Sequence, residues 1–323
     1  MTLLISRVLV ILLALAVSVS AGDLDSQIKT LVETTPAARG ALVGVLVVDL
    51  ANGQTLAAHN PDHFFVPASN TKLFTTALAL ARLGSDYRFS TTVMSDRAPD
   101  ASGTVGWLRL VGGGDPNLSN RTLPYQPGPS SGNPLQPIEE LADQLVARGL
   151  RRVAGDVTGD DSAYVWAPYP EGWAVDDGIW DYGAPVNALV VNDNTFSLKV
   201  EPGARAGDPA RLTPLPALEF YQIDNRVRTR AGGERKIWVD REPGSRQLRL
   251  WGYIPLRDPG ETEVLGIEDP AWYAARALID ALSRRGVAVG GIPQAWHLYP
   301  NQLADLRQGQ PAAPDTAVEL ARR

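Results

Sequence analysis

The sequence predicts a mixed α/β (α+β) protein, and two kinds of apolar pattern support this prediction. Short apolar runs rich in Val and Leu, such as residues 41–50, are too short for a stable helix and are typical of buried strands. Other segments, such as residues 70–83, repeat apolar side chains at helical spacing and end at a glycine. No similarity recurs at a period of roughly 20 to 50 residues, which argues against a repeat architecture.

The first predicted element is a β-hairpin. The run ALVGVLVVDL at 41–50 forms its first strand, and residues 54–58 form the second. Between them lies Asn52-Gly53, a pair that tolerates the positive φ angles of a tight hairpin turn. The sequence therefore predicts two antiparallel strands before residue 59.

A helix is predicted next, over residues 70–83. Gly84 stands where the C-terminal cap of this helix belongs. An amphipathic helix gains its stability by burying its apolar face, so we expect this face to pack on the preceding hairpin. That contact would hold the first turn of the helix rigidly. The apolar side chains at helical spacing are Leu73, Phe74, Ala77, Leu78 and Ala81.

The rest of the chain alternates short strands with two further helices. One helix begins at Pro137 and ends at Gly149; the other begins at Asp269-Pro270 and ends at Gly286. Residues 124–137 are rich in Pro, Gly and Ser and predict a loop. The predicted strands are 104–111, 186–191, 196–200, 236–239 and 247–254.

Composition excludes several classes of function. The 323 residues include 30 basic and 36 acidic side chains, for a net charge of −6 without any run of Lys or Arg. This balance gives no electrostatic footprint for nucleic acid or anionic lipid. The chain has no cysteine, so disulfides, thiolate metal sites and a cysteine nucleophile are excluded.

The amino terminus predicts a secretory signal over residues 1–21. Arg7 precedes an apolar run at 8–19, and small residues follow at 20–22, with cleavage expected after Ala21. A membrane anchor would need roughly 20 apolar residues, and this run is shorter. We therefore expect an exported protein of the periplasm or cell envelope, with no stable membrane span after cleavage.

The sharpest chemical signal is the S-x-x-K pattern of Ser69-Asn70-Thr71-Lys72. At the first turn of a helix, residues three apart share a face, so the Lys72 amine can reach the Ser69 hydroxyl. A lysine whose charge is disfavoured by burial can take the serine proton, and the helix N-terminus can stabilise a developing oxyanion. The pattern alone is not specific, because Ser26-Gln27-Ile28-Lys29 also matches it and because Ser69 could simply cap the helix.

Other chemistries find weaker support. His59 and His63 lie in a loop and leave only His297 to complete a zinc site, so no metal is expected. The glycines of residues 112–116 lack a following Lys-Ser/Thr, so they predict a backbone turn rather than a phosphate loop. A hydrolase of the G-x-S-x-G type is unsupported, because that motif is absent.

A paired-carboxylate glycosidase is a further alternative. Short-range acidic clusters are usually solvated turns, and we expect that outcome here. Three tryptophans in the same region could stack on sugar rings, but large aromatic residues more often anchor packing, so we expect them to be buried. The acidic residues are Asp156, Asp160, Asp161, Asp176 and Asp177, and the tryptophans are Trp166, Trp173 and Trp180.

The ordered motifs resemble one family. Residues 42–84 are similar to the amino-terminal part of the penicillin-recognising serine enzymes, which carry S-x-x-K. Further blocks resemble the class C penicillin-binding D-alanyl-D-alanine carboxypeptidase/endopeptidases within that group. They are LRLVGGGDPNLS (108–119), VAGDVTGDDSAY (153–164), EGWAVDD (171–177), YGAPVNALVVNDNTF (182–196) and DPAWYAARALIDALSRRGVAVGG (269–291).

The resemblance implies an incomplete penicillin-binding transpeptidase/β-lactamase-like domain with a large β-rich insertion. Residues 22–88 would form the amino-terminal part of the catalytic domain, 89–300 the insertion, and 301–323 the start of the return to the catalytic domain. The family's later S-x-N and K-T-G motifs are missing: no K-T-G follows Lys72, and the one downstream S-x-N, Ser131-Gly132-Asn133, lies too early to be catalytic. We therefore expect a chain truncated before these motifs.

The resemblance implies a serine-type D-Ala-D-Ala carboxypeptidase/endopeptidase that acts on peptidoglycan peptides through an acyl-enzyme on Ser69, with Lys72 transferring the proton. No cofactor is required, β-lactams would acylate the same serine, and the substrate-binding residues stay unassigned. A truncated chain of this kind could be inactive. The alternatives are a non-catalytic envelope protein or gene fragment that binds cell-wall polymer or a partner, and a related serine β-lactamase.

Overall fold

The computed structural model describes residues 21–121, 132–303 and 316–323, so the predicted signal lies outside the described residues except for Ala21. The chain divides between Tyr87 and Arg88 into two compact units. Within the described residues, no helix has both the length and the apolar character to cross a membrane.

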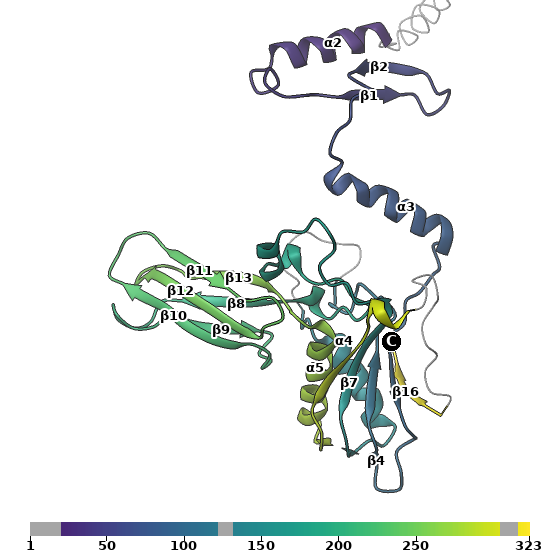
Figure 1. Ribbon diagram of the computed structural model, residues 1–323, viewed down its shortest axis with the longest axis vertical. Coiled ribbons are helices and arrows are strands. Elements are labelled where there is room, and N and C mark those ends of the chain that lie inside the picture. The colour runs from purple at the N-terminus through teal and green to yellow at the C-terminus, as the bar shows by residue number, and fades with distance from the viewer. Residues whose placement is uncertain (1–20, 122–131, 304–315) are drawn as a thin grey trace, which may run out of the picture. The chain divides into compact units, whose positions relative to one another are not determined.

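The first unit begins with a helix and the predicted hairpin. Strands β1 (Val45–Val48) and β2 (Thr55–His59) pair antiparallel, as predicted. The Asp49 carboxylate holds the turn by accepting hydrogen bonds from the Ala51 N–H and the Asn52 amide, and Gly53 takes the expected positive φ of 75°. Helix α2 (Ala21–Thr34), which was not predicted, packs on β2 (Figure 1).

Helix α3 (Thr71–Leu83) also forms as predicted and ends at Gly84, but the expected burial is wrong. None of its residues is buried, and the side chains of Leu73 and Phe74 are 67% and 76% exposed. A two-stranded hairpin has little apolar surface on which a second helix could pack, because α2 already packs on β2. The first unit therefore presents an uncovered apolar stripe along α3.

A five-stranded sheet of order β15-β7-β5-β3-β16 lies at the centre of the second unit. The strands β5, β7 and β15 run parallel, whereas β3 and β16 pair antiparallel at one side. A short parallel sheet of order β14-β6-β4 accompanies it. The bounds are β3 (Thr92–Ser95), β4 (Thr104–Val105), β5 (Leu108–Val111), β6 (Arg152–Val153), β7 (Val157–Val165), β14 (Ala288–Val289), β15 (Pro293–Leu298) and β16 (Val318–Arg322).

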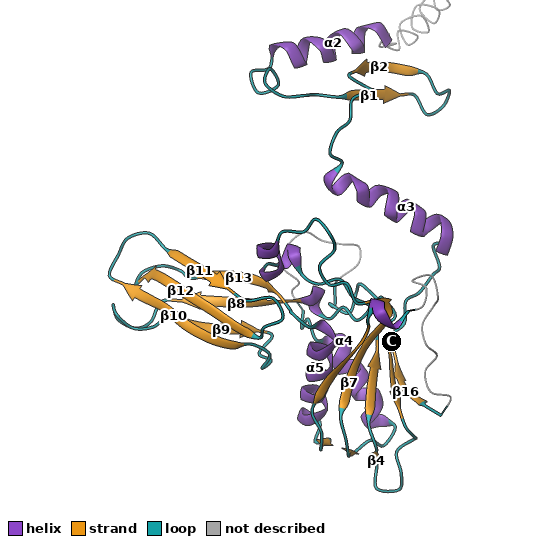
Figure 2. Cartoon of the chain, in the orientation of Figure 1, coloured by secondary structure: helices purple, strands orange, loops and turns teal. Residues whose placement is uncertain are grey.

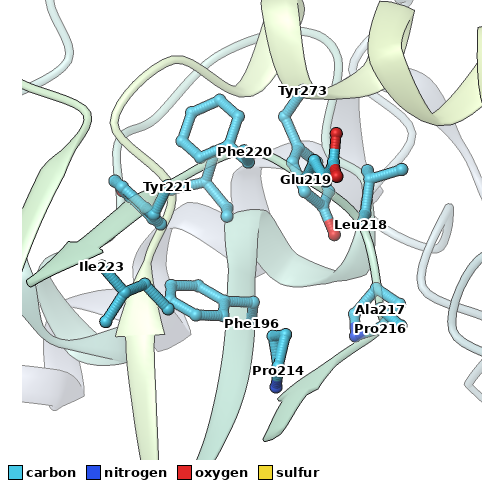
Figure 3. Close-up of a pocket in the computed structure, with 11 residues that line it drawn as sticks. Phe196, Pro214, Pro216, Ala217, Leu218, Glu219, Phe220, Tyr221, Ile223 and Tyr273 are labelled. Atoms are coloured by element: carbon cyan, nitrogen blue, oxygen red, sulfur yellow. The ribbon is translucent and has the colours of Figure 1, made fainter. Parts of the chain in front are cut away.

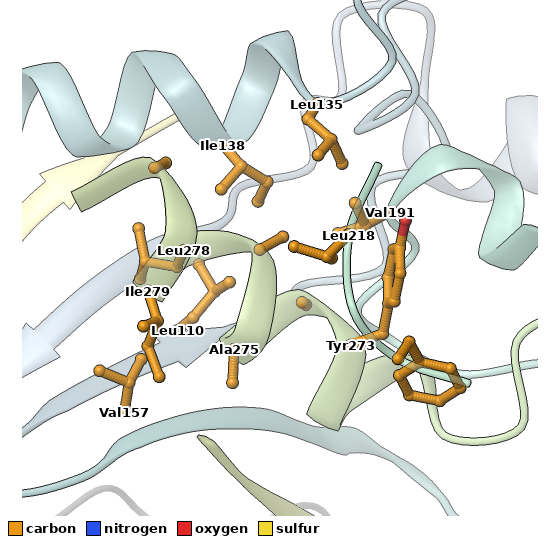
Figure 4. Packing of buried hydrophobic residues seen from close by; sticks show 14 of the residues in the cluster. Leu110, Leu135, Ile138, Val157, Val191, Leu218, Tyr273, Ala275, Leu278 and Ile279 are labelled. Carbon is orange, nitrogen blue, oxygen red and sulfur yellow. The ribbon is translucent and has the colours of Figure 1, made fainter. Parts of the chain in front are cut away.

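The two predicted helices, α4 (Gln136–Ala147) and α5 (Pro270–Arg284), pack together, and α5 lies on β7 and β15. Their apolar side chains and those of the sheet form a continuous core (Figure 4). At the α4–α5 contact, the nearly buried Glu139 carboxylate accepts hydrogen bonds from both Arg284 and Arg285. This arrangement compensates a buried charge with two cations.

The approach of α5 to the sheet requires a glycine. A Cβ atom on Gly159 of β7 would lie 1.9 Å from the Ala271 carbonyl oxygen in the first turn of α5. Only a residue without a side chain allows the helix backbone to come this close.

Six longer strands form two further three-stranded sheets (Figure 2). One has the order β13-β8-β9 and the other the order β10-β12-β11. Apolar side chains of both, including Leu198, Val227 and Leu250, belong to the buried core. The predicted strands 196–200, 236–239 and 247–254 are confirmed. The bounds are β8 (Thr195–Glu201), β9 (Arg211–Leu215), β10 (Gln222–Arg230), β11 (Lys236–Asp240), β12 (Gln247–Pro255) and β13 (Glu261–Gly266).

Two predicted segments differ in the structure. Residues 104–111 split at Gly106 into β4 and β5, which belong to different sheets. Residues 186–191 form only one isolated bridge, Val191 to Leu118; Ala188 and Leu189 are both buried, whereas a strand would alternate them between two faces. Within residues 301–323, the described strand β16 pairs with β3 in the second unit.

A buried polar cluster joins β7, β15 and the start of α5. His297 Nδ1 lies 2.9 Å from Asp161 Oδ1, and its Nε2 lies 3.7 Å from Asp269 Oδ1, which also caps α5 by accepting from the Trp272 N–H. The Trp166 ring stacks on the imidazole at 4.0 Å. Burial lowers the pKa of His297, but hydrogen bonds to the two carboxylates and their charges more than reverse this and raise it to about 9.

Replacing Gly159 by alanine is expected to destabilise the second unit. The strand and helix must separate to admit the new Cβ, and overpacking of this kind costs about 1–3 kcal/mol or more. Gly232→Ala is the matched control, because a Cβ there has no neighbouring atom within 4 Å. Urea unfolding of both variants measures the difference, and equal midpoints would contradict the close approach.

The charge of His297 predicts how stability depends on pH. Since folding raises its pKa from 6.5 to about 9, the stabilisation is complete below pH 6.5 and is lost as the pH rises through about 9. The shift corresponds to roughly 3 kcal/mol at most. Thermal unfolding from about pH 6 to about pH 10 should show the wild-type Tm falling, while His297→Gln starts lower and changes less. Parallel curves for the two proteins would rule out this role.

Candidate active site

Ser69 and Lys72 meet at the start of α3. Ser69 lies in a short 3₁₀ turn (Ala68–Asn70) that leads directly into the helix, and Lys72 lies in the first helical turn. The Lys72 Nζ donates a hydrogen bond to Ser69 Oγ across 2.9 Å. The structure thus brings together the two residues that the S-x-x-K spacing predicts.

The backbone before Ser69 is strained. Ala68 has a φ of 44°, in the left-handed region that an alanine rarely occupies. Strain of this kind clusters at functional sites, where the surrounding structure imposes it. No side chain caps the N-terminus of the 3₁₀ turn or of α3, so the hydroxyl of Ser69 is not used as a cap. The alternative interpretation of Ser69 as a capping residue therefore loses its support.

The second S-x-x-K match has a different setting. Ser26 and Lys29 lie beyond the first turn of α2, where the backbone N–H groups already bond within the helix. No free N–H group of the helix terminus is available there to stabilise an oxyanion. The position of the motif within its helix separates the two matches, although the four-residue pattern does not.

The acidic cluster forms the expected solvated turns only in part: Asp176 is exposed in a short 3₁₀ turn, whereas the two neighbouring aspartates of β7 are buried. Asp160 and Asp161 are 5% and 1% exposed on β7, because each is paired: Asp160 lies 3.7 Å from Arg109, and Asp161 contacts His297 and the Asn187 amide. Buried carboxylates need such partners. Both therefore serve the fold of the second unit rather than a carboxylate pair facing a substrate.

The remaining candidate residues have structural surroundings. Trp166 stacks on His297 and Trp180 packs against the core, as expected, whereas Trp173 is 39% exposed. The turn at 112–116 does bring backbones together, since a Cβ on Gly112 would lie 2.3 Å from the Ala188 oxygen. Within the described ranges, no group of three or more metal-ligating side chains is placed to hold an ion.

The downstream S-x-N match falls partly outside the described residues, which exclude Ser131. Its Asn133 side chain accepts a hydrogen bond from the Leu135 N–H at the start of α4. This hydrogen bond joins residues two apart and stabilises a local turn.

A cavity of about 260 Å³ lies in the second unit, lined only by residues of that unit (Figure 3). Its walls are mostly aromatic and aliphatic, including Phe196, Phe220 and Tyr273. The Tyr273 hydroxyl is buried without a hydrogen-bond partner among the described residues, and burial raises its pKa. The lining offers no paired nucleophile and base, so the cavity has no catalytic arrangement comparable to Ser69 and Lys72.

Two features of these sites were not predicted from the sequence. The strain at Ala68 has no sequence signal, because alanine does not favour positive φ. The Asp161–His297–Asp269 cluster joins residues far apart in the chain, and only the Asp269-Pro270 helix start was visible in advance.

Known proteins resemble this chain along most of its length. The D-alanyl-D-alanine carboxypeptidase of Actinomadura sp. (strain R39) is 32% identical over 287 residues, which are 85% of this chain and 50% of that protein. The D-alanyl-D-alanine carboxypeptidase DacB of Haemophilus influenzae is 23% identical over 58% of this chain and 36% of its own length. This chain thus spans about half the length, or less, of these curated relatives.

The fold is also similar to that of a solved protein. The crystal structure of penicillin binding protein 4 (dacB) from Haemophilus influenzae matches with a TM-score of 0.62 and 19% identity, covering 87% of this chain and 55% of that chain. A structure of the same protein complexed with a β-lactam matches with a TM-score of 0.57 and 18% identity, covering 88% of this chain and 55% of that chain.

The predicted resemblance to the D-alanyl-D-alanine carboxypeptidases is confirmed. A family model, described as the D-Ala-D-Ala carboxypeptidase 3 (S13) family, matches residues 24–296, which include both Ser69 and Lys72. The chain belongs to this family.

Proposed function

We propose that the chain carries the nucleophile and the base of a serine D-Ala-D-Ala carboxypeptidase that acts on peptidoglycan peptides. The observation that supports this most directly is the 2.9 Å hydrogen bond between Lys72 Nζ and Ser69 Oγ at a helix N-terminus. Family membership and the carboxypeptidase names of the relatives support the substrate class.

In the proposed reaction, Ser69 Oγ attacks the carbonyl carbon between the two D-alanines. The Lys72 amine accepts the serine proton and passes it to the leaving amine of the terminal D-alanine. The Asn70 and Thr71 N–H groups at the start of α3 already donate to carbonyl oxygens of the preceding turn, so donors for the developing negative charge would have to be other N–H groups. Water then hydrolyses the ester on Ser69. Ser69 would attack the carbonyl carbon of a β-lactam in the same way. Because that carbonyl is part of a ring, the leaving amine would stay covalently attached to the acyl group.

The exposed state of the pair limits this reaction. Lysine accepts a proton only as the neutral amine, and removal from water favours that form. Both Ser69 and Lys72 are exposed, as is the apolar face of α3. We infer that further protein covers this face in the active enzyme and supplies the S-x-N and K-T-G groups that the resemblance implies. Residues 22–88 would then be one part of a catalytic domain.

Export to the periplasm or cell envelope is also a proposal. It rests on the signal pattern of residues 1–21 and on the bacterial relatives, which are named D-alanyl-D-alanine carboxypeptidases. The peptide substrate proposed for Ser69 is found in that compartment.

Acylation by a β-lactam tests the role of Ser69. We expect the purified chain, incubated with a fluorescent penicillin, to form an adduct that peptide mass spectrometry maps to Ser69. Rates should be low, because missing oxyanion donors typically cost about a hundredfold to a thousandfold each. Ser69→Ala should abolish the adduct. Ser26→Ala, in the other S-x-x-K match, should leave it unchanged.

Two results would contradict this assignment. An adduct that persists in Ser69→Ala would show that a residue other than Ser69 is the nucleophile. Complete absence of adduct in a chain shown by circular dichroism to be folded would favour the non-catalytic alternative, an envelope protein that binds cell-wall polymer or a partner.

The role of Lys72 predicts a distinct kinetic signature. Lys72→Ala removes the proton acceptor, so the acylation rate constant should fall by roughly a hundredfold or more, in the range of general-base effects. The lost rate should return in part as the pH is raised, because hydroxide then replaces the base. Arg82→Ala, at the other end of α3, is the matched control for loss of a cation. It should change neither the acylation rate constant nor its dependence on pH. Equal rates in Lys72→Ala and wild type would remove Lys72 from the mechanism.

A further inference from the structure

The outer face of the β10-β12-β11 sheet has an unusual composition. The inward positions are buried or half-buried and mostly apolar, including Val227, Leu248 and Leu250; Asn225 and Thr229 are the polar exceptions on β10. Apart from the terminal Pro255, every outward position on the three strands carries a charged, amide or aromatic side chain, and none carries an aliphatic one. Because alternate residues of a strand face opposite sides, these outward side chains share one surface.

Strand register arranges this surface in cross-strand rows. One row places Trp251 between Arg226 and Trp238, and the next places Tyr253 between Arg228 and Lys236. Side chains at directly paired positions lie close together on the same side of a sheet. We call this surface the Trp–Arg face; its members are Arg226, Arg228, Lys236, Trp238, Trp251 and Tyr253.

The aromatic members are accessible. The side chains of Trp238 and Trp251 are 47% and 38% exposed, and their rings lie 6.2 Å apart within 13° of parallel. Large aromatic side chains are rarely left in water in such a pair. Beside them, the Arg230 guanidinium lies over the Tyr253 ring at 3.4 Å, which leaves a cation at the edge of the aromatic row.

The cations of the face are incompletely paired. Arg226 forms an ion pair with Asp224 at 2.8 Å. Among the described residues, neither Arg228 nor Lys236 has an ion-pair partner, although both are exposed. The chain as a whole carries a net charge of −6, so a cluster of free cations stands out against an acidic background. An anionic partner would complement it.

The mixture of side chains favours a glycan over a protein partner. The buried centres of protein interfaces are depleted in charged residues, whereas here both rows contain charged side chains, directly beside Trp251 and Tyr253. A pyranose ring has an apolar C–H face, which can stack on an indole, and a rim of hydroxyl groups, which can bond to Arg, Lys and Gln. Carboxylates on the sugar would pair with Arg228 and Lys236.

We propose that the Trp–Arg face binds peptide-free stretches of the cell-wall glycan strand, where the lactyl carboxylates are free, with sugar rings on Trp238 and Trp251 and sugar carboxylates at Arg228 and Lys236. The face would hold the chain on the polymer independently of any chemistry at Ser69. Its location on the second unit assigns a binding role to a part of the chain that carries no proposed catalytic residue.

Binding of peptide-free glycan strands tests this proposal. The strands are prepared from peptidoglycan by removing the peptides, so that only sugar rings and lactyl carboxylates remain and no peptide can engage Ser69. We expect the full chain to bind them, with isothermal titration calorimetry as the readout, because it does not depend on the tryptophans that the variants remove. Trp238→Ala/Trp251→Ala should weaken binding at least tenfold. Arg228→Ala/Lys236→Ala should weaken it severalfold and reduce its dependence on salt.

Matched controls separate this surface from other features. Trp296→Ala removes a tryptophan that is 51% exposed beside Arg109 on a different sheet and should bind as wild type. Ser69→Ala should also bind as wild type, so failure of the proposed catalytic function would not affect this result. Chitin oligosaccharides, which have similar rings without carboxylates, should bind more weakly than the strands. Circular dichroism and melting curves check that each variant is folded.

Several outcomes would overturn the proposal. Unchanged glycan binding in both double variants would exclude the face, and absence of binding by the wild type would exclude the ligand. Tighter binding of duplex DNA or of an acidic peptide, lost in Trp238→Ala/Trp251→Ala, would assign the face to a different partner. Concentration-dependent self-association that the same variant abolishes would make the partner a second copy of the chain.

Discussion

The close approach of helix α5 to strand β7 at Gly159 determines how the second unit is built. It lets the apolar face of α5 bury residues such as Leu278 and Leu282 completely against the sheet. Both ends of the helix also form polar contacts with neighbouring elements. At its start, Asp269 caps the helix and reaches His297, and at its end Arg284 and Arg285 neutralise Glu139 of α4. A shift of this helix would disturb the sheet, the neighbouring helix and the buried polar cluster together.

The sequence predicts the elements of this fold wherever local patterns decide them. The hairpin follows from Asn52-Gly53, and α4 and α5 follow from proline starts, glycine ends and apolar spacing. Prediction fails where contacts between residues far apart in the sequence determine the structure. Residues 186–191 have the composition of a strand, but the surrounding core buries adjacent side chains and leaves a single bridge. Asp160 and Asp161 resemble turn residues in the sequence. They are buried because Arg109 and His297, from other strands, pair with them.

The same distinction explains how much of the candidate site was predictable. Ser69 and Lys72 are three residues apart at a helix start, so the helix alone brings them to 2.9 Å, whatever else packs around it. The properties that would turn this pair into a catalyst are burial of the amine, a completed oxyanion hole and a substrate cleft, and all of them require contacts from distant segments. The exposed α3 has none of this burial. Its apolar stripe is therefore informative, because a helix with Leu73 and Phe74 in water lacks the packing that ordinarily stabilises such a helix.

The two units differ in how far their exposed side chains depend on further packing. The first unit holds the Ser69–Lys72 pair on a helix whose apolar face is uncovered, so the proposed chemistry depends on contacts that the pair itself does not provide. The second unit has a continuous core and balanced buried charges, so the exposed side chains of its outer sheet are held in a defined array by strand register alone. A surface of that kind needs no additional packing to bind a ligand. Binding to polymer and bond cleavage would then depend on separate parts of the chain, and a change that removes one need not alter the other.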